Sequence, residues 1–185
     1  MTDSSEKRAD APAEGVSASH RWSAGRAALL IGVVAVAWFV FDRVTKAHFD
    51  GYHLGESIGG PYAGIFEFTL VHNTGAAWGI FDDATFLLGL SSTVVSFAVA
   101  VLAIVFARRS NWVLSLGAGL IAAGGLGNAL DRFMLGYVVD FINLSFIEFP
   151  VFNIADIGVT CGFVLVVIAF IFFWNPSEER LEADA

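Results

Sequence analysis

Four long apolar stretches limit what this chain can fold into. They cover residues 24–41, 84–107, 112–130 and 157–174, and the second and fourth contain no charged side chain. A helix needs roughly 20 mostly apolar residues to cross the hydrocarbon core of a bilayer. Since 56% of the residues are hydrophobic, the composition is also typical of a membrane protein rather than a soluble one. We therefore expect an α-helical integral membrane protein with four transmembrane helices.

The two ends of the chain are polar. Residues 1–22 are mixed in charge and rich in Ala and Ser, and residues 176–185 are polar and largely acidic. Such segments are predicted to be disordered tails, which leaves residues 23–175 as one membrane domain. The first apolar stretch ends in FDRVTK rather than in a small-residue cleavage site, so it predicts a retained anchor and not a cleaved signal peptide.

The positions of lysine and arginine predict the orientation in the membrane. Four of them lie within the first 26 residues, and Arg108 and Arg109 connect the second and third stretches, whereas residues 47–83 contain none. Because cytoplasmic loops carry the excess of these residues, we expect both tails in the cytoplasm. Segments 47–83 and 131–156 are then expected on the outer face. The net charge of −8 disfavours nucleic acid as a partner.

Parts of the outer segments have the pattern of β-structure. Residues 62–72 alternate loosely between apolar and polar and are rich in aromatic and β-branched side chains, which predicts a strand. In the following loop, NTGAAWGIF, Gly75 and Gly79 either let the backbone approach a ligand closely or form a plain turn before the second helix. The run YVVDFINLSFIEF, residues 137–149, is also rich in strand-forming residues.

Two outer aspartates are the strongest candidates for chemistry. Asp140 lies among bulky apolar residues in GYVVDFI, and Asp156 closes FNIAD where the fourth helix begins. An unpaired carboxylate in mid-bilayer would cost about 2.5 to 3.5 kcal/mol, so such acids are functional candidates. Asp156 also has a structural reading, because Asn153 and Asp156 have the spacing of a capping box. Fifteen residues separate the two aspartates, enough for a turn at Pro150 that brings them together.

A pair of aspartates in contact can activate water. Since two adjacent carboxylates cannot easily both ionise, one keeps a proton while the other is charged. The charged member can take a proton from water while the neutral member donates to a peptide carbonyl. We expect Asp156 to be the base, because a helix N-terminus favours its anion, and Asp140 to hold the proton.

Other polar residues near the helix ends permit purely structural readings. The neighbours Asp131 and Arg132 could form a local ion pair at the end of the third helix. Asp42 and Lys46 are four residues apart, so they share a face of the first helix and can stabilise its end.

Small residues form a run in the third helix, and a single cysteine lies in the fourth. Glycines and alanines between Gly117 and Gly127 allow close packing of the third helix, and the same smooth face could admit a substrate helix. Cys161 is the one cysteine and lies within the fourth helix, where we expect it to serve as a small packing residue.

Five short motifs together resemble those of a known family. DRVTK (42–46), NTGAAWG (73–79), GNALDR (127–132), VVDF (138–141) and FNIAD (152–156) follow one another among four apolar stretches. In this order they resemble lipoprotein signal peptidase, also called signal peptidase II. The resemblance implies a bacterial inner-membrane aspartic endopeptidase that removes the signal peptide from diacylglyceryl-modified prolipoproteins, cutting just before the lipid-bearing cysteine. It also implies a small outer antiparallel β-sheet and a short, mobile outer helix between the first two membrane helices.

The resemblance also implies roles for single residues. Asp140 and Asp156 would form the catalytic pair, and Asp42 and Lys46 would support the site. The residues expected to bind substrate or surround the pair are Asn73, Gly75, Asn128, Asp131, Arg132 and Asn153. No metal or other cofactor is implied, and the expected partners are prolipoproteins and membrane lipids, with the enzyme a monomer. Trp78 stands where Phe is more usual in the family, which concerns only the packing of the loop.

The residues alone leave other functions open. A proton-coupled transporter also uses acids in the membrane, but it favours acids near mid-helix and repeated halves. A serine peptidase would need a histidine within the helices, and a metallopeptidase would need an H-E-x-x-H motif, which the sequence lacks. His48, Asp50, His53 and Glu56 could together hold a metal, but as loop residues they are expected to be solvated.

Overall fold

Four long helices form the body of the molecule. The computed structural model describes residues 22–75, 84–106 and 111–173. The helices are α1 (Ala24–Phe49), α2 (Thr85–Val105), α3 (Trp112–Met134) and α4 (Ile154–Phe173). Each is long and apolar enough to cross a membrane, which confirms the four predicted transmembrane helices. Helix α1 continues beyond its apolar stretch to Phe49, so it carries its polar last turns out of the hydrocarbon region.

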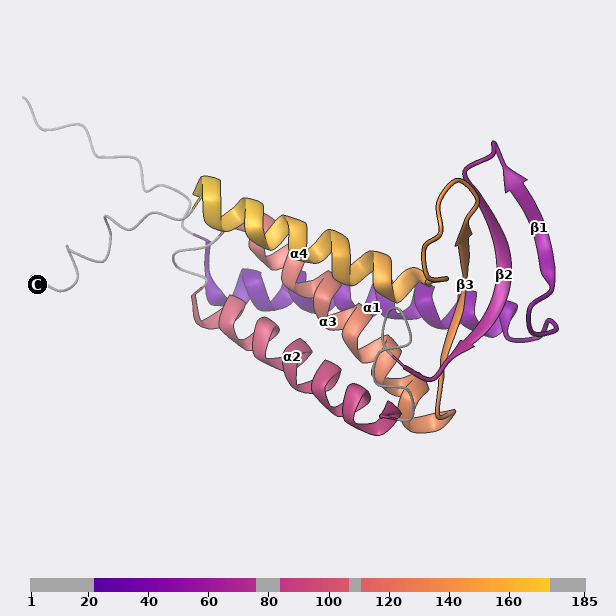
Figure 1. The fold of residues 1–185 in the computed structure, drawn as a ribbon. Helices are drawn as coiled ribbons and strands as arrows, with labels where there is room; N and C mark the ends of the chain where they lie inside the picture. Colours follow the sequence, from indigo (N-terminus) through magenta and orange to yellow (C-terminus); the bar gives the residue numbers. More distant parts are fainter. Residues whose placement is uncertain (1–21, 76–83, 107–110, 174–185) are drawn as a thin grey trace, which may run out of the picture.

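Helix α3 is the centre of the bundle. Its most apolar window is 78% buried inside the protein, against 11% to 22% for the other three helices. Helix α3 runs between the other helices, and α2 lies apart from α4 (Figure 1). The exposed faces of α1, α2 and α4 carry large apolar side chains, such as Leu29, Phe97 and Ile171, that suit a lipid environment.

Glycines permit the close contact between α3 and α4. A Cβ atom added at Gly117 would lie 2.7 Å from the carbonyl oxygen of Gly162, and one added at Gly124 would collide with the carbonyl oxygen of Ala155. On another side of α3, a Cβ at Gly119 would lie 2.9 Å from Val34 of α1. The small residues therefore serve helix packing, and α1 and α4 already cover the face that could have admitted a substrate helix.

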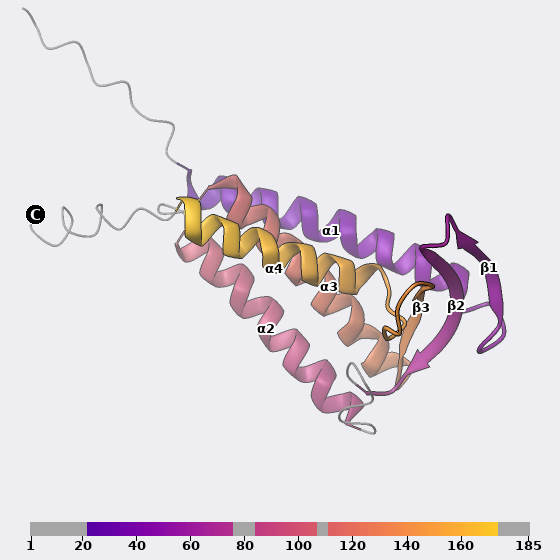
Figure 2. The same cartoon turned by 45° about the horizontal axis from the view of Figure 1, so that its top comes forward.

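A small antiparallel sheet lies at one end of the bundle. It consists of β1 (Ser57–Tyr62), β2 (Phe66–Asn73) and β3 (Val138–Leu144), in the order β1-β2-β3. Strands β2 and β3 pair from Phe66 with Leu144 to Asn73 with Val138. Figures 1 and 2 show the sheet at the end where α1 finishes and α4 begins, opposite the end where α1 begins and α4 finishes. This confirms the small antiparallel sheet.

The single strand predicted over residues 62–72 is wrong in its extent. Tyr62 ends β1, and β2 begins at Phe66 after a tight turn. The turn residues Ala63 and Gly64 have positive φ angles of 52° and 70°, which a continuous strand does not contain. The aromatic run therefore forms a hairpin, with Tyr62 opposite Phe66.

Aromatic side chains attach the sheet to the end of α1. Phe49 stacks on Phe141 with 4.1 Å between ring centroids, and Leu70 and Val139 complete the buried cluster. Each of these side chains is at most 9% exposed. The extension of α1 to Phe49 thus fixes the position of β3 and of the residues that β3 carries.

The short outer helix expected between α1 and α2 is not found within residues 50–75, which form turns and two strands. Residues 76–83, which include Trp78 and Gly79, lie outside the described residues. The same holds for residues 1–21 and 174–185, and hence for nearly all of both predicted tails.

Candidate active site

Strand β3 presents Asp140 to a cavity at the sheet end of the bundle. The residue is 2% exposed, and its two carboxylate oxygens accept hydrogen bonds from Asn73 Nδ2 at 2.9 Å and Asn153 Nδ2 at 2.6 Å. Burial raises the pKa of Asp140 to about 7, and the nearby charge of Asp156 adds to the effect. Asp140 can therefore hold a proton near neutral pH.

Asp156 lies in the first turn of α4, where the predicted capping box is present. Asn153 N donates to Asp156 Oδ2 at 3.0 Å, and Asp156 N donates to Asn153 Oδ1 at 3.1 Å. This reciprocal pair confirms the structural reading of the two residues. The other carboxylate oxygen, Oδ1, accepts from Asn128 Nδ2 at 2.7 Å. Asp156 therefore both caps α4 and lines the cavity.

Asn153 joins the two carboxylates. Its side chain bonds to Asp140 through Nδ2 and to the backbone of Asp156 through Oδ1, and it is fully buried. The turn containing Pro150 brings the start of α4 back onto β3, where Phe152 and Ile142 form a bridge with two backbone hydrogen bonds of 2.8 and 3.0 Å. The chain therefore brings both aspartates to one place, as their spacing allowed.

The two aspartates line a cavity of about 440 Å³. Its charged and amide lining comes from Asn73, Arg132 and the two carboxylates. The apolar lining comes from the β3–α4 connection and from one face of α4: Leu144, Phe149, Pro150, Val151, Phe152 and Ile157. Thr160 and Cys161 follow on α4. Cys161 is exposed and lines the cavity, so it is not the small packing residue that we expected.

Arg132 is placed between the cavity and the loop after β2. Its Nη2 donates to the carbonyl oxygen of Gly75 at 3.1 Å, and its Nη1 lies 3.5 Å from the carbonyl oxygen of Asn128. The described residues provide no carboxylate within 4.0 Å of its guanidinium, and none of them bonds to its buried Nε. Arg132 therefore has donor capacity left for a group in the cavity.

Asp131 does not pair with its neighbour Arg132, contrary to the local ion pair considered above. Its oxygens contact Arg43 Nη1 at 2.6 Å and Lys46 Nζ at 2.8 Å, both on α1. The side chain is 1% exposed and is not part of the cavity lining. Successive residues of a helix point about 100° apart, so Asp131 and Arg132 face different partners.

The predicted contact of Asp42 with Lys46 is part of a larger buried cluster. Lys46 Nζ lies 3.3 Å from Asp42 Oδ2, and Arg43 Nη2 lies 2.7 Å from the same oxygen. Asp42 Oδ1 accepts from the backbone N–H of Ala155 at 3.0 Å, next to Asp156. Sequence reasoning did not assign a role to Arg43, although DRVTK places this cation directly beside Asp42. The cluster joins α1, α3 and the start of α4 behind the carboxylate pair.

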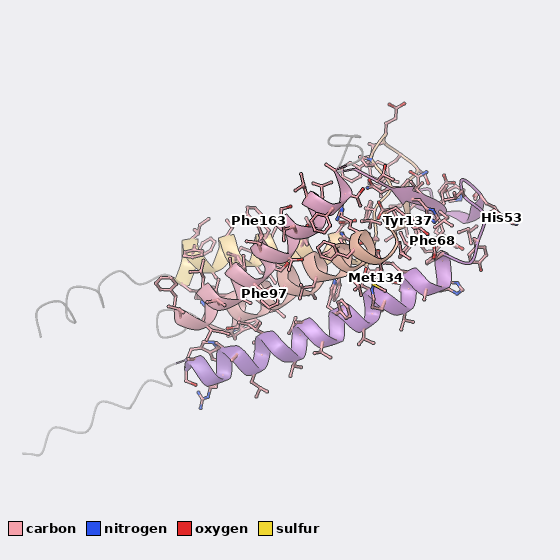
Figure 3. All side chains as sticks on the ribbon, turned by 90° about the horizontal axis from the view of Figure 1, so that it is seen from below. His53, Phe68, Phe97, Met134, Tyr137 and Phe163 are labelled. Carbon is pink, nitrogen blue, oxygen red and sulfur yellow. The ribbon has the colours of Figure 1, made fainter. Side chains whose placement is uncertain are left out.

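The residues considered for a metal site are spread apart. Among the described residues, no group of three His, Cys, Asp or Glu side chains is close enough to hold a metal ion. Asp50 pairs instead with His72 at 3.1 Å, whose ring stacks on Tyr137. Figure 3 shows His53 near the far end of the sheet, beyond Phe68 and Tyr137.

These features define a class of protein. The buried carboxylate of Asp140 and the partly buried one of Asp156 line one cavity, at the same end of a four-helix membrane bundle, rather than at mid-helix as in a proton pathway. The arrangement is that of an aspartic peptidase embedded in a membrane.

Comparison with known proteins identifies the family within that class. The sequence model of the family described as "Signal peptidase (SPase) II" matches residues 34–172. A lipoprotein signal peptidase of Nostoc punctiforme is 39% identical over 155 residues, covering 83% of this chain and 96% of that protein. One of Lactiplantibacillus plantarum is 36% identical over 137 residues, covering 74% and 90%. The chain therefore belongs to the signal peptidase II family.

Solved structures are similar to the fold as well. One, described as a bacterial membrane enzyme at 2.3 Å resolution, aligns with a TM-score of 0.67 at 29% sequence identity, covering 83% of this chain and 92% of that chain. A second, at 1.9 Å resolution, gives a TM-score of 0.66 and covers 81% and 96%.

Proposed function

We propose that this protein removes the signal peptide of diacylglyceryl-modified prolipoproteins by cutting just before the lipid-bearing cysteine. The observation that carries the proposal is that Asp140 and Asp156 line one cavity. The side chain of Asn153 bonds to both residues, to the carboxylate of Asp140 and to the backbone N–H of Asp156. Membership of the signal peptidase II family indicates peptide-bond hydrolysis. The geometry supplies two acids for it, one buried on β3 and one at the N-terminus of α4.

The two carboxylates differ in a way that assigns their roles. Each accepts two hydrogen bonds, Asp140 from two asparagine side chains and Asp156 from Asn128 and the backbone of Asn153. Only Asp156 lies at a helix N-terminus, which favours its ionised form. Asp140, with its pKa raised to about 7, holds the proton. Asp156 then takes a proton from water as the water attacks the scissile carbonyl, and Asp140 donates its proton to the carbonyl oxygen. When the C–N bond breaks, the proton on Asp156 passes to the leaving nitrogen and a hydroxyl of the intermediate returns a proton to Asp140, which leaves the new carboxyl group and restores both aspartates.

The cavity wall suits a lipid-bearing peptide. Apolar side chains of the β3–α4 connection and of α4 line the same cavity, where acyl chains can pack. Arg132 and Asn73 lie at the polar part, where they can donate to carbonyl oxygens of the peptide or of the ester linkage. Arg132 also donates to the carbonyl oxygen of Gly75 and so holds this residue beside the polar lining.

The remaining site residues support the pair rather than bind substrate. Asn128 and Asn153 are buried and bond directly to the carboxylates. Asp131, Asp42 and Lys46 form the ion-pair cluster behind them, so we assign all three a supporting role. We further propose that the sheet and the cavity face the outer side of the bacterial inner membrane, with both ends of the chain in the cytoplasm, because residues 47–83 contain no lysine or arginine while four of these residues precede or begin the first helix.

Cleavage of defined substrates tests this function. The purified protein in detergent is expected to shorten a diacylglyceryl-modified prolipoprotein to a product that begins at the lipid-bearing cysteine, as read by mass spectrometry. The same precursor without the lipid is the matched control and is expected to react at least about tenfold more slowly, because it leaves the apolar part of the cavity unfilled. Equal cleavage of both precursors, or a cut at another bond, would contradict the proposal.

A further inference from the structure

Three asparagine side chains contact the aspartate pair, and each presents its NH₂ group. Asn73 and Asn153 donate to Asp140, and Asn128 donates to Asp156 Oδ1 at 2.7 Å. An asparagine amide can equally well present its oxygen, which would favour a protonated partner instead of an anion. The orientation of these three amides therefore affects which aspartate carries the proton.

Obligate donors determine the orientation of all three amides. The oxygens of Asn73 and Asn153 accept from the backbone N–H groups of Gly75 and Asp156, at 3.1 Å in both cases. The oxygen of Asn128 accepts from Lys46 Nζ at 2.7 Å. Backbone N–H and ammonium groups have no acceptor site, so in each case the amide oxygen must face them and the NH₂ must face the carboxylate.

Lys46 differs from the other two anchors because it is a side chain from a distant part of the sequence. It reaches Asn128 from α1 and is 2% exposed, held by Asp131 at 2.8 Å and by Asp42 at 3.3 Å. Asn153 Nδ2 adds a second, longer bond of 3.0 Å to the same oxygen, but that NH₂ also donates to Asp140 at 2.6 Å. Lys46 thus provides the charge-assisted bond that anchors Asn128.

We propose that Lys46 is a positioning residue for the catalytic pair: its ammonium group holds the amide of Asn128 with the NH₂ toward Asp156, which makes Asp156 the anion that accepts the proton of water. The proposal rests on the proposed function of the two aspartates. It assigns the buried cluster on α1 a part in the chemistry beyond the packing of helices.

The charges around the pair provide a matched control. Arg132 of α3 faces the cavity, and behind Asn128 lie two acids, Asp42 and Asp131, and two cations, Arg43 and Lys46. Both cations pair with both acids, so removing either one leaves the cluster with the same excess negative charge. Of the two cations, Lys46 bonds to the side chain of Asn128, whereas Arg43 bonds to Asp42, Asp131 and the backbone of Gly127.

The pH profile of kcat/KM separates the two cations. Lys46→Met is expected to move the acidic limb of the profile upward by about one to two pH units, because Asp156 loses an oriented donor to its charged form. Arg43→Met is expected to move the same limb less. Part of that difference follows from charge alone, because the charge of Lys46 acts directly on both aspartates and that of Arg43 is not among the charges acting on them. The double-mutant cycle below separates this direct effect from the action through Asn128. Equal shifts in the two variants, or no shift in Lys46→Met, would overturn the proposal.

A double-mutant cycle tests whether Lys46 acts through Asn128. Asn128→Ala alone should move the acidic limb upward, and adding Lys46→Met should then move it little further, because both changes remove one contact. A full additional shift in the double variant would overturn the proposal. Lys46→Gln takes the place of Lys46→Met in both experiments if the methionine variant does not fold. Cleavage retained by Asp156→Asn would contradict the proposed function itself, whereas an unshifted Lys46 variant of an enzyme that needs both aspartates contradicts only the role of Lys46.

Discussion

Val139 and Phe141 flank Asp140 in the sequence but pack away from its carboxylate. Successive side chains of a strand point to opposite faces, and these two join Phe49 and Leu70 in the cluster between the sheet and α1. The bulky neighbours that made Asp140 conspicuous therefore reflect strand alternation rather than the walls of its site. What surrounds the carboxylate are two asparagines, one from β2 and one before α4, whose approach no local pattern predicts.

The buried state of Asp140 predicts a pH dependence of stability. Its pKa is about 7 in the folded protein, above the ordinary value of 3.8, so between these values the folded state binds more protons than the unfolded state. Its contribution to stability is therefore fully present below about pH 4 and is lost as the pH rises through about 7.

Asp140→Asn isolates this contribution. In detergent, the wild type is expected to lose thermal stability between pH 5 and pH 8 more steeply than Asp140→Asn, whose side chain does not titrate. Melting temperatures measured across this range for the two proteins check the difference. Parallel curves would show that Asp140 has no raised pKa.

At the scale of elements, the apolar stretches predicted the four helices, and the spacing of Asp42 and Lys46 placed both on the end of the first helix. The structure has α1 continue to Phe49 and α3 to Met134, beyond the apolar stretches. The strand prediction failed at Ala63 and Gly64 because loose alternation continues across a hairpin turn. Pairing of β2 with β3 joins segments about 70 residues apart, such as Val71 and Asp140, and depends on the packing of the bundle.

The contact of α3 with α4 predicts a strong effect of one methyl group. Gly124→Ala places its Cβ against the carbonyl oxygen of Ala155, so we expect a loss of roughly 1 to 3 kcal/mol in the free energy of unfolding. Activity should fall as well, because Ala155 directly precedes Asp156.

Gly32→Ala is the matched control on α1. A Cβ at Gly32 meets no atom within 4 Å, so the change should leave activity intact and stability unchanged or raised by about 1 kcal/mol through helix propensity. Thermal unfolding and cleavage rates of the two variants check both expectations. Similar effects of the two substitutions would argue against the close α3–α4 contact.

At the scale of the molecule, the fold brings residues of five elements to one end of the bundle. Asn73 lies on β2 and Asp140 on β3, Lys46 and Asn128 lie near the ends of α1 and α3, and Asp156 lies at the start of α4. The motifs predicted most of these residues because the order DRVTK to FNIAD resembles a known family. They did not predict that Asp131 pairs with Arg43 and Lys46 instead of Arg132, since partners across helices depend on the rotation of each helix in the bundle.

The central claim is that Asp140 and Asp156 together cleave the substrate. Its most direct test is single-turnover cleavage of the diacylglyceryl-modified prolipoprotein by Asp140→Asn and Asp156→Asn, each compared with Asp50→Asn. Asp50 lies at the end of α1, pairs with His72 and does not line the cavity, so it is a carboxylate of the same type outside the site. We predict that each of the first two variants cleaves about 10² to 10⁴ times more slowly than wild type, the usual loss when a general acid or base is removed. Asp50→Asn should cleave at close to the wild-type rate. Near-normal cleavage by either Asp140→Asn or Asp156→Asn, in protein that remains folded, would contradict the account.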